Sequence, residues 1–199
     1  MGLCLMSEFL ETIKCVDGEV LNIEYHQKRY ESVLKSLGCD EVEDLISHIN
    51  PPKWGVYKCR VVYAPHAIDI TYDEYKKKEI ERFKVVFDNS IEYAQKKLNR
   101  AEIDTLYEKR DGCDDILIIK NLFITDTSIA NIAFYDDNLA IWVTPKNPLL
   151  KGTTRARLLD EGRLVEAEIK VHELRRFTKV ALLNAMIGFD VLERYDFLI

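Results

Sequence analysis

The sequence of 199 residues is 47% hydrophobic and 31% charged, the composition of a globular protein that can bury a substantial core. Its net charge is −6 and its basic residues are scattered among acidic ones, which argues against a nucleic-acid-binding protein. The longest apolar stretch, residues 180–189, is about half a membrane span and contains Asn184, so a membrane protein is not expected.

The first part of the chain has the pattern of a small α+β unit. Asn22 can cap a helix whose apolar stripe runs to Leu37, and Gly38 supplies its end. Asp17-Gly18 is a tight-turn pair between two strands. The expected elements are strands over 9–15 and 20–21, helices over 22–37 and 40–49, and a hairpin of strands over 56–63 and 67–72.

The second part of the chain has the pattern of a barrel-like α+β domain that begins at about residue 88. We therefore expect a small N-terminal domain over residues 1–87 and a C-terminal domain over 88–199. From residue 83 on, the expected elements are a strand over 83–87 at the end of the first domain, then a helix over 101–109, strands over 116–119, 132–135 and 139–143, a helix over 153–161, a strand over 164–169, a helical turn over 172–177, and two final strands.

The cysteines and histidines are isolated from one another in the sequence. The five cysteines are odd in number and form no C-x-x-C pair, which is typical of free thiols in a reducing compartment. Zinc needs clustered soft ligands, so no metal site is expected. Met6 stands where a myristoylation pattern needs Ser or Thr, and Glu8 and Glu11 interrupt the N-terminal apolar run. These features predict a cytoplasmic protein.

Two features of the second half carry chemistry when they are combined with Lys96. Asp126 offers a carboxylate, and the turn Gly152-Thr153-Thr154 opens a helix, whose first amides and dipole favour an anion. A carboxylate keeps a ring nitrogen protonated, and a lysine amine condenses with an aldehyde. Together these are the parts needed to hold pyridoxal 5'-phosphate.

Each of these features also has a purely structural interpretation. Lys96 and its neighbour Lys97 are then two surface lysines, and Asp126 is a turn residue. The Gly-Thr-Thr turn is then a helix cap that needs no ligand.

The order and spacing of these residues resemble the class IV aminotransferase family, or fold-type IV. That family includes branched-chain and D-amino-acid aminotransferases and aminodeoxychorismate lyase. Residues 96–99 (Lys-Lys-Leu-Asn) are similar to a Lys-x-Leu-Asn segment of the family, and residues 152–155 (Gly-Thr-Thr-Arg) to its Gly-Ile-Thr-Arg turn. Residues 184–186 (Asn-Ala-Met) resemble the Asn-Ala-Leu segment of the lyases, and residues 9–13 (Phe-Leu-Glu-Thr-Ile) the family's Phe-Glu-Thr-Ile.

The resemblance implies a role for individual residues. Lys96 is implied as the catalytic lysine, and Asp126, where the family usually has glutamate, as the partner of the ring nitrogen. Arg29 is implied as a phosphate ligand, whereas His26 is expected to be a buried histidine on a packed helix face. Arg60 is a candidate ligand for a substrate carboxylate, or alternatively one partner of a strand-edge ion pair. The implied cofactor-binding residues are Arg29, Lys96, Asp126, Ser128, Asn131, Thr153, Thr154, Asn184 and Ala185.

The resemblance implies an α+β, two-domain, fold-type IV (D-amino-acid aminotransferase-like) protein whose C-terminal domain binds the cofactor. It implies a homodimer that acts on a small amine or carboxylate substrate, most like the 4-amino-4-deoxychorismate lyase of folate biosynthesis, which eliminates pyruvate and leaves 4-aminobenzoate. The alternatives are a branched-chain or D-amino-acid aminotransferase and a non-catalytic relative that acts as a binding module. Usual members carry a longer segment before the position of Phe9, which shapes part of the substrate pocket, so the substrate stays open.

Overall fold

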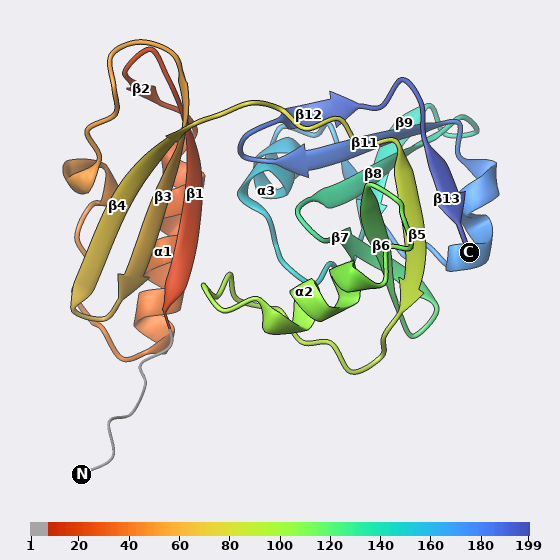
Figure 1. Cartoon of the computed structure of the whole chain (residues 1–199), viewed down its shortest axis with the longest axis horizontal. Helices are drawn as coiled ribbons and strands as arrows, with labels where there is room; N and C mark the ends of the chain where they lie inside the picture. The colour runs from red at the N-terminus through yellow and green to blue at the C-terminus, as the bar shows by residue number, and fades with distance from the viewer. Residues whose placement is uncertain (1–7) are drawn as a thin grey trace. The chain divides into compact units, whose positions relative to one another are not determined.

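The computed structural model describes residues 8–199, which divide into two compact units (Figure 1). The first unit runs to Lys77 and takes in Gln95–Asn99, and the second consists of Lys78–Ala94 and Arg100–Ile199. Met6 and Cys4 lie outside the described residues, and the other four cysteines are free thiols, as expected. Within residues 8–199 no helix is long and apolar enough to cross a membrane.

The first unit is an antiparallel sheet of four strands, in the order β2-β1-β3-β4, with helix α1 packed on one face (Figure 1). Alternate residues of β1 and β3 are buried against the helix, because successive side chains of a strand point to opposite faces. The Tyr63 ring meets the Tyr30 ring of α1 edge to face, with centroids 4.8 Å apart. The elements are β1 (Phe9–Val16), β2 (Glu19–Val20), α1 (Ile23–Ser36), the 3-10 turn η1 (Leu45–His48), β3 (Val56–Ala64) and β4 (Ala67–Glu74).

Two local predictions in this unit are wrong. Asn22 precedes α1 but lies in the left-handed region (φ 52°) and its side chain makes no capping hydrogen bond. The helix expected over 40–49 is only the short turn η1, with Leu45 as its single buried residue. Asp40, Glu41, Glu43 and Asp44 crowd like charges into the segment before this turn, which disfavours a helix there.

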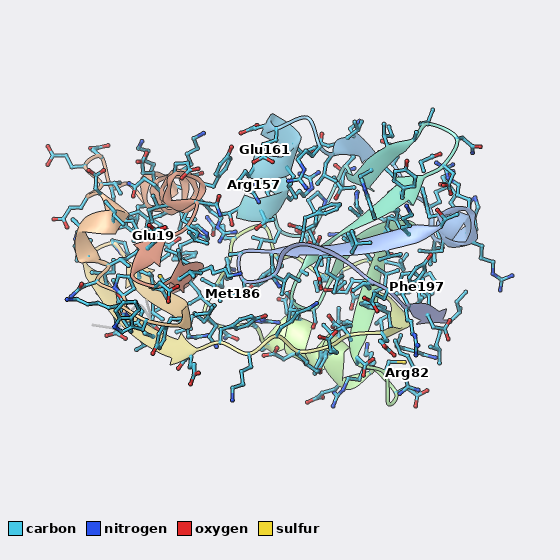
Figure 2. The ribbon with its side chains drawn as sticks, turned by 90° about the horizontal axis from the view of Figure 1, so that it is seen from above. Glu19, Arg82, Arg157, Glu161, Met186 and Phe197 are labelled. Carbon is cyan, nitrogen blue, oxygen red and sulfur yellow. The ribbon has the colours of Figure 1, made fainter. Side chains whose placement is uncertain are left out.

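The second unit is a mixed sheet of nine strands. Seven of them run in the order β10-β9-β8-β7-β6-β5-β13, and β11 joins this path by pairing with β8 and β12. Figure 2 shows Phe197 of β13, whose strand runs parallel to β5. The elements are β5 (Arg82–Phe87), α2 (Ala101–Glu108), β6 (Asp115–Lys120), β7 (Phe123–Thr127), β8 (Asn131–Asp136), β9 (Ile141–Pro145), α3 (Thr153–Asp160), β10 (Val165–Ala167), the 3-10 turn η2 (Val171–Arg176), β11 (Lys179–Asn184), β12 (Gly188–Val191) and β13 (Asp196–Leu198).

Two helices of this unit cover apolar faces of the sheet. Helix α2 packs through Ile103 and Leu106 on buried isoleucines of β6. Helix α3 packs through Leu158 on Ala133 and Leu183, while its outer face carries an ion pair between Arg157 and Glu161 (Figure 2). The second half of α3 is thereby packed against the sheet.

The division of the chain differs from the predicted boundary at residue 87. Strand β5 belongs to the second unit because it pairs in parallel with β6. Residues 95–99 return to the first unit, where the Leu10 amide donates to the Lys96 carbonyl and the Leu98 amide to the Glu8 carbonyl. The chain also ends with three strands, β11, β12 and β13, rather than the two expected.

Candidate functional site

Asp126 lies on β7 with its carboxylate buried, and the residue is 5% exposed. Its Oδ1 accepts a hydrogen bond of 2.6 Å from Asn131 Nδ2, its cross-strand neighbour on β8. Its Oδ2 accepts one of 2.9 Å from the Leu150 amide. The Asn131 amide also donates to the Leu150 carbonyl, at 2.8 Å. Asp126 and Asn131 together therefore hold the loop that precedes α3.

The surroundings of Asp126 change the acidity of its carboxyl group. Burial raises its pKa to about 6, although the hydrogen bonds from Leu150 and Asn131 and the charge of Arg155 oppose the rise. In residues 8–199 no lysine or arginine forms an ion pair with this carboxylate. A buried carboxylate with this environment favours a cationic partner, which is what a protonated ring nitrogen supplies.

Helix α3 begins directly beside this pair. A Cβ atom at position 152 would lie 2.1 Å from Asn131 Oδ1, so only glycine fits there. Thr153 and Thr154 follow in the first turn, each 7% exposed. The first amides of a helix have no partner within that helix, and the helix dipole adds positive potential there. The turn can therefore hold an anionic phosphate.

Arg155 anchors this helix to the sheet. Its Nη2 donates to the Pro145 carbonyl at 2.8 Å and to Glu166 Oε1 at 2.6 Å. The residue is 3% exposed. These contacts give Arg155 a structural role in fixing the direction of α3.

Ser128 lies in the turn that joins β7 to β8. Its amide donates to Asp115 Oδ1 at 3.3 Å, and its carbonyl accepts from Arg100 Nη2 at 2.8 Å. Asp115 is 1% exposed, and burial raises the pKa of its carboxyl group. Asp115 and Arg100 were not predicted as site residues, although an acid at the start of an apolar strand is a signal that the sequence contains.

Asn184 ends β11 and shapes the turn that follows. Its Oδ1 accepts from the amides of Met186 and Ile187, at 2.9 Å and 3.1 Å, and its Nδ2 donates to the Ile129 carbonyl at 3.4 Å. Ala185 lies within this turn. In the second unit, a hydrogen bond thus joins the turn after β7 to the turn that Asn184 begins. Other hydrogen bonds join Asp126 and Asn131 to the loop that leads into α3.

Lys96 lies in the first unit, where its Nζ donates to Thr12 Oγ1 at 3.1 Å. Thr12 stands on β1, beside the segment that carries the lysine. The hydroxyl acceptor gives the lysine amine a defined direction. Thr12 belongs to the Phe-Leu-Glu-Thr-Ile segment, and its contact with Lys96 was not predicted.

Arg29 is held by Glu11 in a two-pronged ion pair. Its Nε donates to Oε1 and its Nη2 to Oε2, both at 2.6 Å, and His26 Nδ1 lies 2.6 Å from Oε2. The expectation of a buried His26 is confirmed, because the residue is 2% exposed. The role of Arg29 as a phosphate ligand stays a prediction. Glu11, fully buried, was missed, although it interrupts the inward-facing apolar positions of β1.

The pKa of Glu11 reflects these partners. Burial alone would raise it, but the charge of Arg29 and the hydrogen bonds from His26 and Arg29 lower it to about 2. Burial also lowers the pKa of His26, and the bond to Glu11 opposes that change.

Replacing Glu11 by glutamine is expected to lower the free energy of unfolding at pH 7 by roughly 3 kcal/mol, since one partner of a buried pair is removed. Because the folded-state pKa lies below the unfolded one, this stability is complete above about pH 4.5 and is lost as the pH falls to about 2. Urea unfolding at several pH values measures it. Glu19→Gln, on the exposed β2 (Figure 2), is the control. Equal pH profiles for wild type and Glu11→Gln would contradict the account.

Arg60 lies on β3 opposite Thr12 in the strand register. Strand β3 is not an edge strand, since it pairs with β1 on one side and β4 on the other. In the described part of the chain Arg60 forms no ion pair, so the alternative of a strand-edge ion pair is wrong. Its role toward a substrate carboxylate stays a prediction.

Known proteins are similar to this chain in sequence and in fold. The family model described as Amino-transferase class IV matches residues 48–190. A protein of Haemophilus influenzae with uncharacterised function is 36% identical over 189 residues, covering 92% of this chain and 100% of that protein. The structure of a candidate 4-amino-4-deoxychorismate lyase from Haemophilus somnus is 33% identical, with a TM-score of 0.85, and covers 94% of this chain and 100% of its own.

A more distant structure shows the same fold. It is a hypothetical aminotransferase from Mycobacterium tuberculosis in a form with α-ketoglutarate and PMP bound, 13% identical with a TM-score of 0.77. It covers 98% of this chain and 83% of its own. These matches confirm the predicted fold class.

Proposed function

The chain belongs to the class IV aminotransferase family, and on this basis we propose that it is a pyridoxal-phosphate-dependent enzyme acting on an amino-acid-type substrate. The activity we propose is most like that of 4-amino-4-deoxychorismate lyase, which eliminates pyruvate and gives 4-aminobenzoate. An aminotransferase is the second candidate. The family depends on pyridoxal phosphate, and the question for this chain is whether its residues fit that cofactor.

The observation that carries the proposal is the buried Asp126 next to the start of α3. The carboxylate lacks an ion-pair partner in the described chain, while Gly152 and the threonines after it open a helix beside it. A buried carboxylate thus lies next to the N-terminus of a helix, which can bind an anion. This arrangement suits a ligand with a cationic ring and a phosphate. The second unit therefore fits the cofactor.

Individual residues would do distinct work in the reaction. When bound, the cofactor supplies an aldehyde for amine attachment and a ring that withdraws electrons from the attached carbon. Asp126 would hold the proton on the ring nitrogen, and the amides at the start of α3 would bind the phosphate. Lys96 would bind the aldehyde and later carry the proton on its Nζ, which Thr12 directs.

The two candidate reactions differ in what becomes of the amino group. In the lyase, the substrate ring loses a proton, and the bond between a ring carbon and the enolpyruvyl oxygen breaks. The leaving enolpyruvyl group gains a proton and becomes pyruvate. The amine stays on the product, so no acceptor is consumed. In an aminotransferase the amino group leaves the substrate, and a 2-oxo acid must receive it.

Two observations favour the lyase. The candidate lyase from Haemophilus somnus is a full-length match at 33% identity. The Asn184-Ala185 turn is the segment in which this sequence resembles the lyases, and Asn184 Oδ1 holds that turn by two backbone bonds. A non-catalytic binding module stays the alternative from a different class.

Assays on the purified protein separate these functions. We expect a yellow protein that releases pyruvate from 4-amino-4-deoxychorismate at a rate independent of added 2-oxo acid. Activity only when a 2-oxo acid is present would indicate the aminotransferase. A colourless protein that takes up no added cofactor would contradict both enzymes and leave the binding module.

A further inference from the structure

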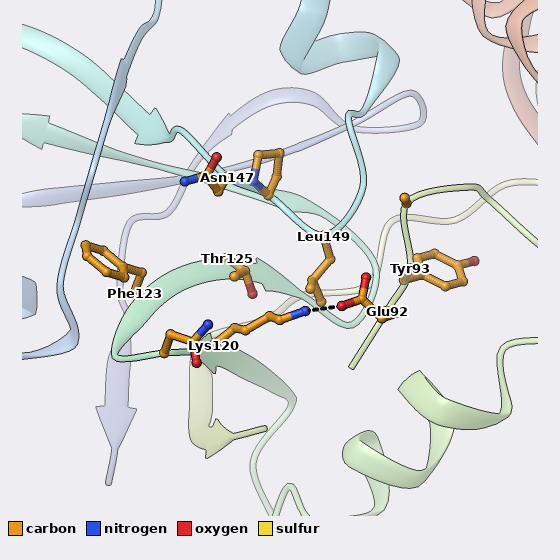
Figure 3. A pocket seen from close by; sticks show the side chains of 10 residues that line it. Glu92, Tyr93, Lys120, Phe123, Thr125, Asn147 and Leu149 are labelled. Atoms are coloured by element: carbon orange, nitrogen blue, oxygen red, sulfur yellow. Dashed lines mark hydrogen bonds and ion pairs between the residues drawn. The ribbon is translucent and has the colours of Figure 1, made fainter. Parts of the chain in front are cut away.

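The second unit contains a pocket of about 420 Å³ that none of the residues assigned to the cofactor lines (Figure 3). This volume lies within the roughly 300–1,000 Å³ of small-molecule sites. Three segments line it: residues 92–94, residues of the β6–β7 hairpin between 120 and 125, and residues 147–149. The pocket is therefore a candidate site in its own right.

Lys120 is the cationic group of this pocket. Its Nζ donates to the Ile91 carbonyl at 2.7 Å and to Glu92 Oε1 at 2.5 Å, and Figure 3 shows it reaching toward Glu92. An ammonium has three donor hydrogens, so one remains for a ligand. The Lys120 side chain is 23% exposed and that of Glu92 is 79% exposed. An ion pair with so exposed a partner is weak, so an anion can displace Glu92.

The other lining residues define the body of the ligand. Phe123, Pro148 and Leu149 present apolar surface, and Asn121 and Asn147 present amide groups. A single lysine beside an aromatic ring matches one carboxylate on a small apolar body. A dianionic phosphate would require more positive charge than this lining offers.

The pocket adjoins the residues that support Asp126. Thr125 lines the pocket, and successive residues of a strand point to opposite faces, so the Asp126 carboxylate lies on the other face of β7. Leu149 also lines it, and the next amide, that of Leu150, donates to Asp126. A ligand here would contact the loop that positions Asp126.

We propose that this pocket binds a small apolar carboxylate, and that its occupant steadies the loop over residues 147–150 and so acts as an effector of cofactor binding. The site is distinct from the cofactor site, because none of the residues assigned to the cofactor lines it and Thr125 lies on the face of β7 opposite to Asp126. The effector role rests on the proposed cofactor, whereas the binding of the carboxylate does not.

Calorimetry with benzoate and its neutral analogue benzamide tests the binding. Wild type is expected to prefer benzoate by at least about tenfold, the equivalent of ~1.4 kcal/mol. Lys120→Gln should abolish this preference, and Asn147→Trp, which fills the pocket from its exposed rim, should block both ligands. Lys146→Gln, at the neighbouring exposed position, should behave as wild type. Benzoate binding that is absent from wild type, or unchanged in both pocket variants, would overturn the site.

Cofactor titration with and without saturating benzoate tests the effector role. We expect tighter binding of pyridoxal phosphate when benzoate is present, and no such change in Asn147→Trp. An unchanged dissociation constant in wild type would overturn the coupling.

Discussion

Lys96→Ala is expected to lower turnover by about 10³-fold or more while the protein stays folded. The lysine amine is assigned both the bond to the cofactor and the transfer of a proton, and a positioned acid–base group alone contributes roughly 10²–10⁴-fold. Its side chain hydrogen-bonds Thr12 at the sheet surface and is not part of the apolar core, so a large loss of stability is not expected. Steady-state kinetics with saturating cofactor measure the effect.

Lys97→Ala is the matched control, because it removes the neighbouring lysine on the same short segment. This variant should keep near wild-type turnover. A loss in Lys97→Ala that equals or exceeds the loss in Lys96→Ala would show that the nucleophile is misplaced.

Asp126→Asn is expected to keep the cofactor and lose turnover by about 10²–10³-fold, the typical cost of removing one electrostatic stabiliser. A neutral amide cannot hold the ring nitrogen protonated as an ionised carboxylate does. Phosphate contacts at the start of α3 remain, so cofactor affinity should change much less than turnover. Kinetics and a cofactor titration on the same sample separate the two effects.

Asp126→Glu should retain far more activity than Asp126→Asn, because it keeps the carboxylate and restores the residue that the family usually has. The amide substitution also places a donor against either the Asn131 or the Leu150 donor, so urea unfolding must accompany the kinetics. Equal turnover in wild type and Asp126→Asn would show that Asp126 only supports its loop.

Local pattern predicted most of the elements of both units. The alternation of β1 and β3 and the Asp17-Gly18 turn determine the first sheet, and both turn residues have positive φ, as a two-residue hairpin requires. The helix expected over 40–49 did not form beyond η1, because the like charges crowded before this turn disfavour a helix although Leu45 and Ile49 pack in the core. The domain boundary was misplaced because strand pairing between β5 and β6 joins segments about 30 residues apart, which local pattern does not reveal.

The candidate site was predicted in part, for similar reasons. Motif spacing selected Asp126 and Asn131, and the structure shows that they are hydrogen-bonded to each other. It did not select Glu11 as the partner of Arg29, or Asp115 and Arg100 as the supports of Ser128. These pairings depend on the fold to bring together distant residues, so spacing along the chain carries no signal for them.

Mapping the lysine that bonds to pyridoxal phosphate tests the central claim most directly. The protein would be loaded with the cofactor, reduced with borohydride, digested and sequenced by mass spectrometry. We predict one cofactor-derived adduct, on Lys96, and none in Lys96→Ala. The absence of an adduct, or an adduct on another lysine such as Lys97 or Lys120, would contradict the assignment.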